Sequence, residues 1–180
     1  YKKVYFFYSG HGTRNDLCLG KTSEDWFSYN SLLIWLDHIE AKDNCIVLDC
    51  CFSGNVMTQS ALDDFGSRNV EIYTSSNIGK TSFSKFHNVN NSITGYGAFN
   101  LALMKCFGEP AAERNGSEGT SLKEAFDWFY KQPENKEIIT KQCPMHLLKR
   151  RATNDTNEAQ TTNLEDTDLS IRQNGKGSNI

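Results

Sequence analysis

Two short segments of the sequence each combine a chemically active side chain with glycine: residues 8–12 (YSGHG) and residues 49–54 (DCCFSG). A cysteine thiol can attack a carbonyl carbon while a histidine imidazole carries protons to and from the reacting groups. Backbone N–H groups can stabilise the oxyanion that forms in such an attack. The two segments therefore predict acyl-transfer chemistry between His11 and a cysteine of the second segment, with the N–H groups of Gly12 and Cys51 as oxyanion donors.

Each segment follows a continuous apolar run of the kind that forms a strand covered on both faces. These runs are residues 4–8 (VYFFY) and 45–48 (CIVL), and a third run spans 70–74 (VEIYT). Between the first two, residues 30–41 place apolar side chains on one helical face, with Asn30 as a candidate N-cap. This order predicts an α/β fold with a parallel sheet, in which both segments reach one crevice at the carboxyl ends of neighbouring strands.

The chain continues with weaker patterns. Residues 75–91, rich in serine and asparagine, predict a long surface loop, and residues 98–107 predict a buried helix. A second loop spans residues 108–119, and the capping-box pattern at 121–124 (SLKE) begins another helix. Residues 143–148 predict an edge strand, because a proline near its start is tolerated only where a lost N–H has no partner.

Residues 151–180 differ from the rest in composition. They hold six apolar side chains and no aromatic one, while Thr, Asn, Gln and Gly dominate. Such a segment cannot offset the entropy of ordering by burying apolar surface. We therefore predict one domain over residues 1–150, followed by a polar, disordered tail.

Composition excludes several functional classes. The chain has 180 residues and a formal net charge of −3, and no basic stripe argues for a nucleic-acid partner. No apolar run approaches the length of a membrane span. Six cysteines without a CxxC pair and four scattered histidines predict neither a disulfide framework nor a metal site, and no cofactor is implied. This cysteine usage favours a reduced, cytoplasmic location.

Together, in this order and on strand ends, the YSGHG and DCCFSG segments resemble the caspase-like cysteine peptidases, a group that includes caspases, metacaspases, paracaspases and legumains. The helix between them and the segments 96–99 (YGAF) and 142–144 (QCP) stand where that group would place them, so the resemblance covers residues 1–150. It implies a three-layer α/β fold with a mainly parallel sheet flanked by helices. The group has a strand and a helix before the histidine strand; because Tyr1 opens on that strand, we expect both to be absent.

The motifs are most similar to those of metacaspases and paracaspases, whose pattern Asp-x-Cys-x-Ser-Gly puts the nucleophile at Cys51 and the base at His11. Alternate side chains of a strand share a face, so Asp49 points the same way as Cys51, and Cys50 points into packing. Likewise, Ser9 points the same way as His11. In these relatives such an acid and serine form the pocket for a basic residue, which implies a cysteine endopeptidase that cleaves polypeptides after Arg or Lys.

The sequence leaves the function, the oligomeric state and calcium dependence open to other interpretations. A catalytically silent, caspase-like interaction domain is the alternative function, and both a monomer and a homodimer fit the sequence. The Asp63-Asp64 pair carries negative charge after the cysteine segment, but no EF-hand spacing supports calcium activation.

Overall fold

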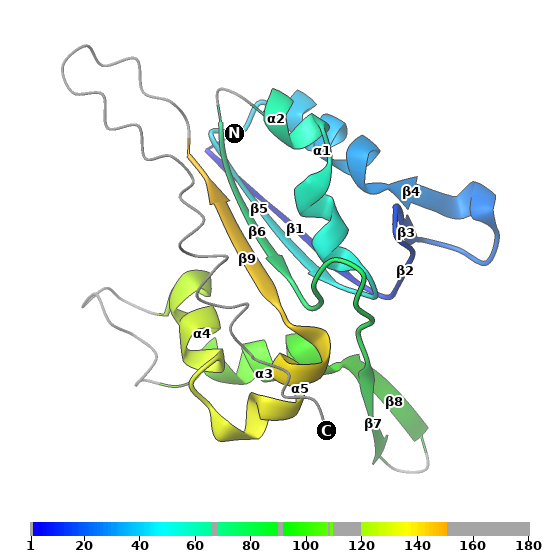
Figure 1. Ribbon diagram of the computed structural model, residues 1–180, viewed down its shortest axis with the longest axis vertical. Coiled ribbons are helices and arrows are strands. Elements are labelled where there is room, and N and C mark those ends of the chain that lie inside the picture. Colours follow the sequence, from blue (N-terminus) through cyan, green and yellow to red (C-terminus); the bar gives the residue numbers. More distant parts are fainter. Residues whose placement is uncertain (1, 66–67, 90–91, 108, 110–119, 151–180) are drawn as a thin grey trace, which may run out of the picture.

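A four-stranded sheet runs through the computed structural model, which describes residues 2–65, 68–89, 92–107, 109 and 120–150 (Figure 1). Its strands lie in the order β1 (Lys3–Ser9), β5 (Asp43–Asp49), β6 (Asn69–Thr74) and β9 (Met145–Lys149). The first three are parallel, and β9 runs antiparallel to β6. The three apolar runs therefore form adjacent parallel strands, and the predicted edge strand pairs with the third of them.

Helices α1 (Tyr29–His38) and α2 (Ala61–Asp64) cover one face of the sheet (Figure 1). The apolar stripe of α1 packs on side chains of β5 and β6 that alternate toward this face. Burying each such side chain contributes roughly 1.5–3 kcal/mol. The fully buried members of this first core include Leu32, Leu33, Leu36, Ile46, Leu48, Val70 and Ile72.

The start of α1 differs from the prediction. Its N-cap is Ser28, whose Oγ accepts the N–H of Ser31 at 3.0 Å, so the expectation that Asn30 caps this helix was wrong. Asn30 Oδ1 instead accepts the N–H of Ala61 at 3.1 Å and ties α1 to α2. Serine and asparagine are equally good N-caps, so the sequence alone did not choose between them.

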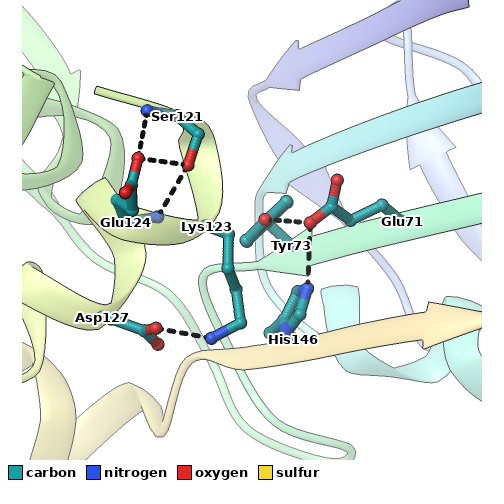
Figure 2. Close-up of polar contacts among 7 residues, drawn as sticks. All are labelled: Glu71, Tyr73, Ser121, Lys123, Glu124, Asp127 and His146. Atoms are coloured by element: carbon teal, nitrogen blue, oxygen red, sulfur yellow. Dashed lines mark hydrogen bonds and ion pairs between the residues drawn. The ribbon is translucent and has the colours of Figure 1, made fainter. Parts of the chain in front are cut away.

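Helices α3 (Ala98–Phe107), α4 (Leu122–Phe129) and α5 (Lys136–Gln142) lie against the other face (Figure 1). The 3₁₀ turn η4 (Pro133–Asn135) leads into α5. The bounds of α3 match the prediction, and the predicted capping box of α4 is confirmed: Ser121 and Glu124 each accept the backbone N–H of the other (Figure 2). The second core includes Cys45, Val47, Tyr73, Phe99, Leu103, Phe126, Phe129 and Ile138.

Two small β structures lie beyond the carboxyl ends of the parallel strands (Figure 1). One is an antiparallel sheet of β2 (His11–Gly12), β3 (Asp16–Cys18) and β4 (Trp26–Ser28), with the 3₁₀ turn η1 (Ser23–Asp25) before β4. The other is a hairpin of β7 (Ser84–Val89) and β8 (Ser92–Gly97). The prediction of a loop over all of residues 75–91 was therefore wrong in its second half. Serine and asparagine have low strand propensity, so β7 depends on its pairing with β8 rather than on its own sequence.

This architecture, with helices on both faces of a mostly parallel sheet, confirms the predicted α/β fold class. The two faces of β1 are unequal. Val4, Phe6 and Tyr8 pack against the first core, whereas Tyr5 and Phe7, on the other face, are 55% and 62% exposed.

Within the described ranges, no helix combines the length and the apolar character that crossing a membrane requires. The predicted tail at 151–180 lies outside the described residues, as does the predicted loop at 108–119 apart from Glu109.

Candidate active site

The two motif segments leave the sheet at one place. Ser9 and Asp49, the last residues of β1 and β5, are direct partners in the parallel register. The chain turns at Gly10, whose N–H donates to the Asp49 carbonyl oxygen at 3.1 Å. This bond anchors the start of the histidine segment on β5, next to the start of the cysteine segment.

Gly12 lies directly against the cysteine turn. A Cβ built on it would stand 2.5 Å from the carbonyl oxygen of Cys51 and 2.8 Å from Cys50 Sγ, closer than a side chain tolerates. Only glycine therefore lets the two segments pack with their backbones in contact. The structure brings the immediate neighbour of His11 against the predicted nucleophile residue.

His11 is exposed at the first position of β2, where it pairs with Cys18 of β3. Residues directly opposite each other in an antiparallel ladder share a face. Cys18 therefore lies beside His11 on the same face of this small sheet.

The ladder also sets the direction of the Gly12 N–H. Hydrogen-bonded and non-hydrogen-bonded pairs alternate along antiparallel strands. The Thr13 N–H donates to the Asp16 carbonyl at 2.9 Å, so the neighbouring Gly12–Leu17 pair is of the non-hydrogen-bonded kind. The Gly12 N–H consequently points away from β3, which suits a donor to an oxyanion.

Cys51 is half-buried, and its sulfur faces the segment that follows β6. The Ser82 N–H donates to Cys51 Sγ at 3.3 Å, and Sγ lies 3.5 Å from the Ser82 carbonyl oxygen. An N–H aimed at sulfur stabilises negative charge that develops there. The next residue, Phe52, has a left-handed backbone with φ of 59°, which turns the chain sharply into the 3₁₀ helix η2 (Ser53–Thr58).

Asp49 is buried, with 3% of its surface exposed. Its carboxylate accepts the Ser82 hydroxyl and the Asn100 N–H, both at 2.9 Å. Burial raises the pKa of this carboxyl, and hydrogen bonds from Asn100, Ser82 and Ser75 oppose the shift. Gly97 makes room for the carboxylate, since a Cβ there would lie 1.9 Å from Asp49 Oδ2. Asp49 therefore holds the first turn of α3, while Ser9 lies exposed at the adjacent strand end.

Ser82 connects these groups, and the sequence did not single it out. It contacts both Cys51 and Asp49. The side chains of these two residues therefore point to the same side of the chain, as the strand alternation predicts. Ser82 stands in a stretch without periodicity or motif, so no signal in one sequence marks it.

Cys50 points the other way, into the first core, and is 1% exposed. Its Sγ lies 3.7 Å from the hydroxyl of Tyr29. Burial raises the pKa of the Cys50 thiol to about 12, so this thiol stays protonated at neutral pH. Cys50 is therefore a packing residue, as the alternation predicts.

Among the described residues, no three His, Cys, Asp or Glu side chains gather in a way that could hold a metal ion. Asp63 is exposed at the surface of α2.

Comparison with known proteins agrees with this chemistry. The profile of the Peptidase C13 family matches residues 2–161, which is most of the chain. No curated protein matches the sequence. The chain therefore belongs to the Peptidase C13 family and is a cysteine-type peptidase, a hydrolase.

Proposed function

We propose that the protein is an endopeptidase in which Cys51 is the nucleophile and His11 the base, and that it cleaves polypeptides after Arg or Lys. The observation that carries the dyad is the contact of Gly12 with the Cys51 carbonyl oxygen. This contact joins the histidine and cysteine segments at the carboxyl ends of β1 and β5, where ligands bind in open α/β sheets.

Peptide-bond hydrolysis by this dyad requires only these two side chains, two backbone N–H groups and water. Cys51 Sγ gives its proton to His11 and bonds to the scissile carbonyl carbon, and the N–H groups of Cys51 and Gly12 stabilise the oxyanion. His11 then protonates the leaving amine as the C–N bond breaks. Water, deprotonated by His11, attacks the thioester, and the C–S bond breaks to release a carboxylate and the thiol.

The preference for Arg or Lys rests on Asp49 and Ser9, together with the resemblance to metacaspases and paracaspases. A carboxylate has about four acceptor sites, and the protein's own donors to Asp49 include Asn100, Ser82 and Ser75. A guanidinium that reached a remaining site would offset the cost of burying the charge.

Mutagenesis with active-site labelling tests the dyad. A peptidyl ketone electrophile with a basic terminal residue should label the wild type but not Cys51→Ala. His11→Ala should lower kcat/KM for a fluorogenic peptide by about 10²–10⁴-fold. The matched control is Cys143→Ala, at the end of α5, which should behave as the wild type. Labelling of folded Cys51→Ala, or unchanged hydrolysis by His11→Ala, would reject the dyad. No label on folded wild type would favour the silent interaction domain.

A peptide library that varies only the residue before the cleaved bond tests the specificity separately. We expect selection of Arg and Lys, and a reduced selection in Asp49→Asn. A preference for another residue would reject the basic pocket while leaving the dyad intact.

A further inference from the structure

Two tyrosine hydroxyls contact the backbone of the candidate active site: Tyr8 opens the YSGHG segment, and Tyr29 lies outside both motif segments. The Tyr8 hydroxyl donates to the His11 carbonyl oxygen at 2.7 Å and lies 2.8 Å from the Cys18 carbonyl oxygen. His11 and Cys18 are opposite partners in the β2–β3 ladder. The hydroxyl therefore binds β2 and lies against β3 at the position of the histidine.

The turn between β1 and β2 is built around the same ring. A Cβ on Gly10 would stand 2.6 Å from Tyr8 Oη and 2.9 Å from its ring. The chain thus folds back closely over Tyr8 before it reaches His11. Tyr8 itself is anchored, because it packs against the first core.

Tyr29, the first residue of α1, also reaches the site and is fully buried. Its hydroxyl donates to the Thr13 carbonyl oxygen at 3.2 Å and lies 3.5 Å from the Cys51 carbonyl oxygen. Thr13 directly follows the histidine segment, and Cys51 belongs to the cysteine turn. A single buried hydroxyl therefore lies between the backbones of the two.

The hairpin is also held on the β3 side, where β3 pairs with β4 and Leu17 is buried in the first core. On the β2 side, the strand is only two residues long, and the Gly10 N–H, just before it, donates to the Asp49 carbonyl oxygen of β5. Catalysis depends on the relative placement of nucleophile and base, since a misplacement of about 1 Å can cost roughly 10²-fold in rate. The side chain of His11 follows its backbone, so groups that fix this backbone also set its distance from Cys51.

We propose that Tyr8 and Tyr29 are positioning residues that set the geometry of His11 relative to Cys51 by binding the backbone carbonyls of His11 and Thr13, with the Tyr29 hydroxyl against the cysteine turn. This inference rests on the dyad proposed above. Burial raises the pKa of Tyr8 to about 12, and it raises that of Tyr29 further, so both hydroxyls remain donors across the working pH range.

Tyr8→Phe and Tyr29→Phe test the proposal, because each removes one oxygen and keeps the ring. We expect each variant to lower kcat by about 10- to 100-fold. The KM should change by less than about twofold, since neither hydroxyl binds substrate. The pH profile of Cys51 alkylation by iodoacetamide, followed by mass spectrometry of its peptide, should move to higher pH, because a displaced His11 no longer activates the thiol as the proposed dyad requires.

Tyr73→Phe is the matched control. It also removes a buried hydroxyl with a hydrogen-bond partner, Glu71, but on the opposite face of the sheet. We expect a loss of thermal stability similar to that of Tyr29→Phe, without a change in kcat or in the alkylation profile. If Tyr29→Phe fails to fold, Tyr8→Phe still tests the proposal. Tyr8 is only partly buried, so we expect this variant to fold.

The outcomes separate the two proposals. If Cys51→Ala and His11→Ala abolish activity while both tyrosine variants keep the kcat and alkylation profile of the wild type, the positioning role is overturned and the dyad stands. If His11→Ala is fully active, the dyad itself fails. Lower kcat with a shifted alkylation profile in Tyr8→Phe, and neither change in Tyr73→Phe, supports the positioning role.

Discussion

At the residue scale, the candidate site depends on places where a side chain must be absent. Gly12 lets the histidine hairpin touch the cysteine turn, and Gly97 leaves space for the buried carboxylate of Asp49. In both cases an added methyl group would collide with atoms that are themselves held by the core. These glycines therefore determine geometry through close approach rather than through unusual backbone angles.

Gly12→Ala should separate the two halves of the site. The new Cβ meets the Cys51 carbonyl oxygen, a backbone atom that cannot swing away. We expect kcat/KM to fall by about 100-fold and the free energy of unfolding by about 1–3 kcal/mol. Peptide hydrolysis and urea denaturation measure the two effects.

The control for this change is Gly79→Ala. Gly79 has φ of 73°, and a Cβ there meets nothing within 4 Å, so the cost is only the left-handed backbone, about 1–2 kcal/mol. Activity should stay at the level of the wild type. Full activity of Gly12→Ala would show that the close contact does not matter.

At the scale of elements, a polar cluster joins β6 to the edge strand β9 (Figure 2). Tyr73 and His146 both bind Oε1 of Glu71, His146 at 3.3 Å. Their rings, direct cross-strand partners, stack with centroids 4.5 Å apart. Burial opposes ionisation of Glu71, but the hydrogen bonds from His146 and Tyr73 outweigh it and hold the pKa of its carboxyl below the usual value.

This cluster predicts a pH-dependent contribution to stability. Because the pKa of Glu71 is lower in the folded state, its contribution is present above the unfolded value of about 4.5 and is lost as pH falls through the folded value. Glu71→Gln should lower the free energy of unfolding by about 1–3 kcal/mol at pH 7. Urea denaturation at a series of pH values should show the gap to the wild type closing below about pH 4.5.

A surface pair serves as the control. Glu137 lies exposed on α5, four residues before Lys141, to which it is paired at 2.8 Å. Glu137→Gln should leave the free energy of unfolding nearly unchanged, because solvent screens an exposed ion pair. A gap for Glu71→Gln that is equally large at pH 4 and pH 7 would contradict the role of its charge.

Helices and strands with a strong local sequence pattern were predictable from the sequence. Elements and contacts that form only through residues distant in the sequence were not. The strands β1, β5 and β6 are continuous apolar runs, and the α4 capping box is a local pattern. By contrast, β7 forms through pairing with β8, and Ser82 reaches Cys51 only because the whole sheet brings them together. The contact of Asp49 with the start of α3 spans 51 positions and has no local signature.

At the scale of the whole molecule, the sheet separates two cores. The first holds Ile46 and the side chains of α1, whereas the second holds Phe129 and the side chains of α3 to α5. Successive residues of β5 contribute to opposite cores. Packing changes in one core should therefore reach the other only through the backbone of the sheet.

This separation predicts additive effects. Ile46→Val and Phe129→Leu should each lower the free energy of unfolding by about 0.5–1.5 kcal/mol. The double variant should show their sum within about 0.5 kcal/mol. Phe126→Leu with Phe129→Leu is the contrasting pair, because these rings stack with centroids 6.3 Å apart, and should deviate from the sum by more. Denaturant titrations measure the free energy of unfolding of each variant. A non-additive result for Ile46→Val with Phe129→Leu would contradict the separation of the two cores.

The uncovered face of β1 has a dynamic consequence. β5 has buried side chains on both faces, whereas Tyr5 and Phe7 leave one face of β1 open to solvent. Local opening costs least where few apolar contacts are lost, so the β1 amides should exchange with deuterium faster than those of β5. His11 follows β1 and Cys51 follows β5. Fraying of β1 would disconnect the dyad while the rest stays folded, and activity in urea should therefore disappear before global unfolding begins.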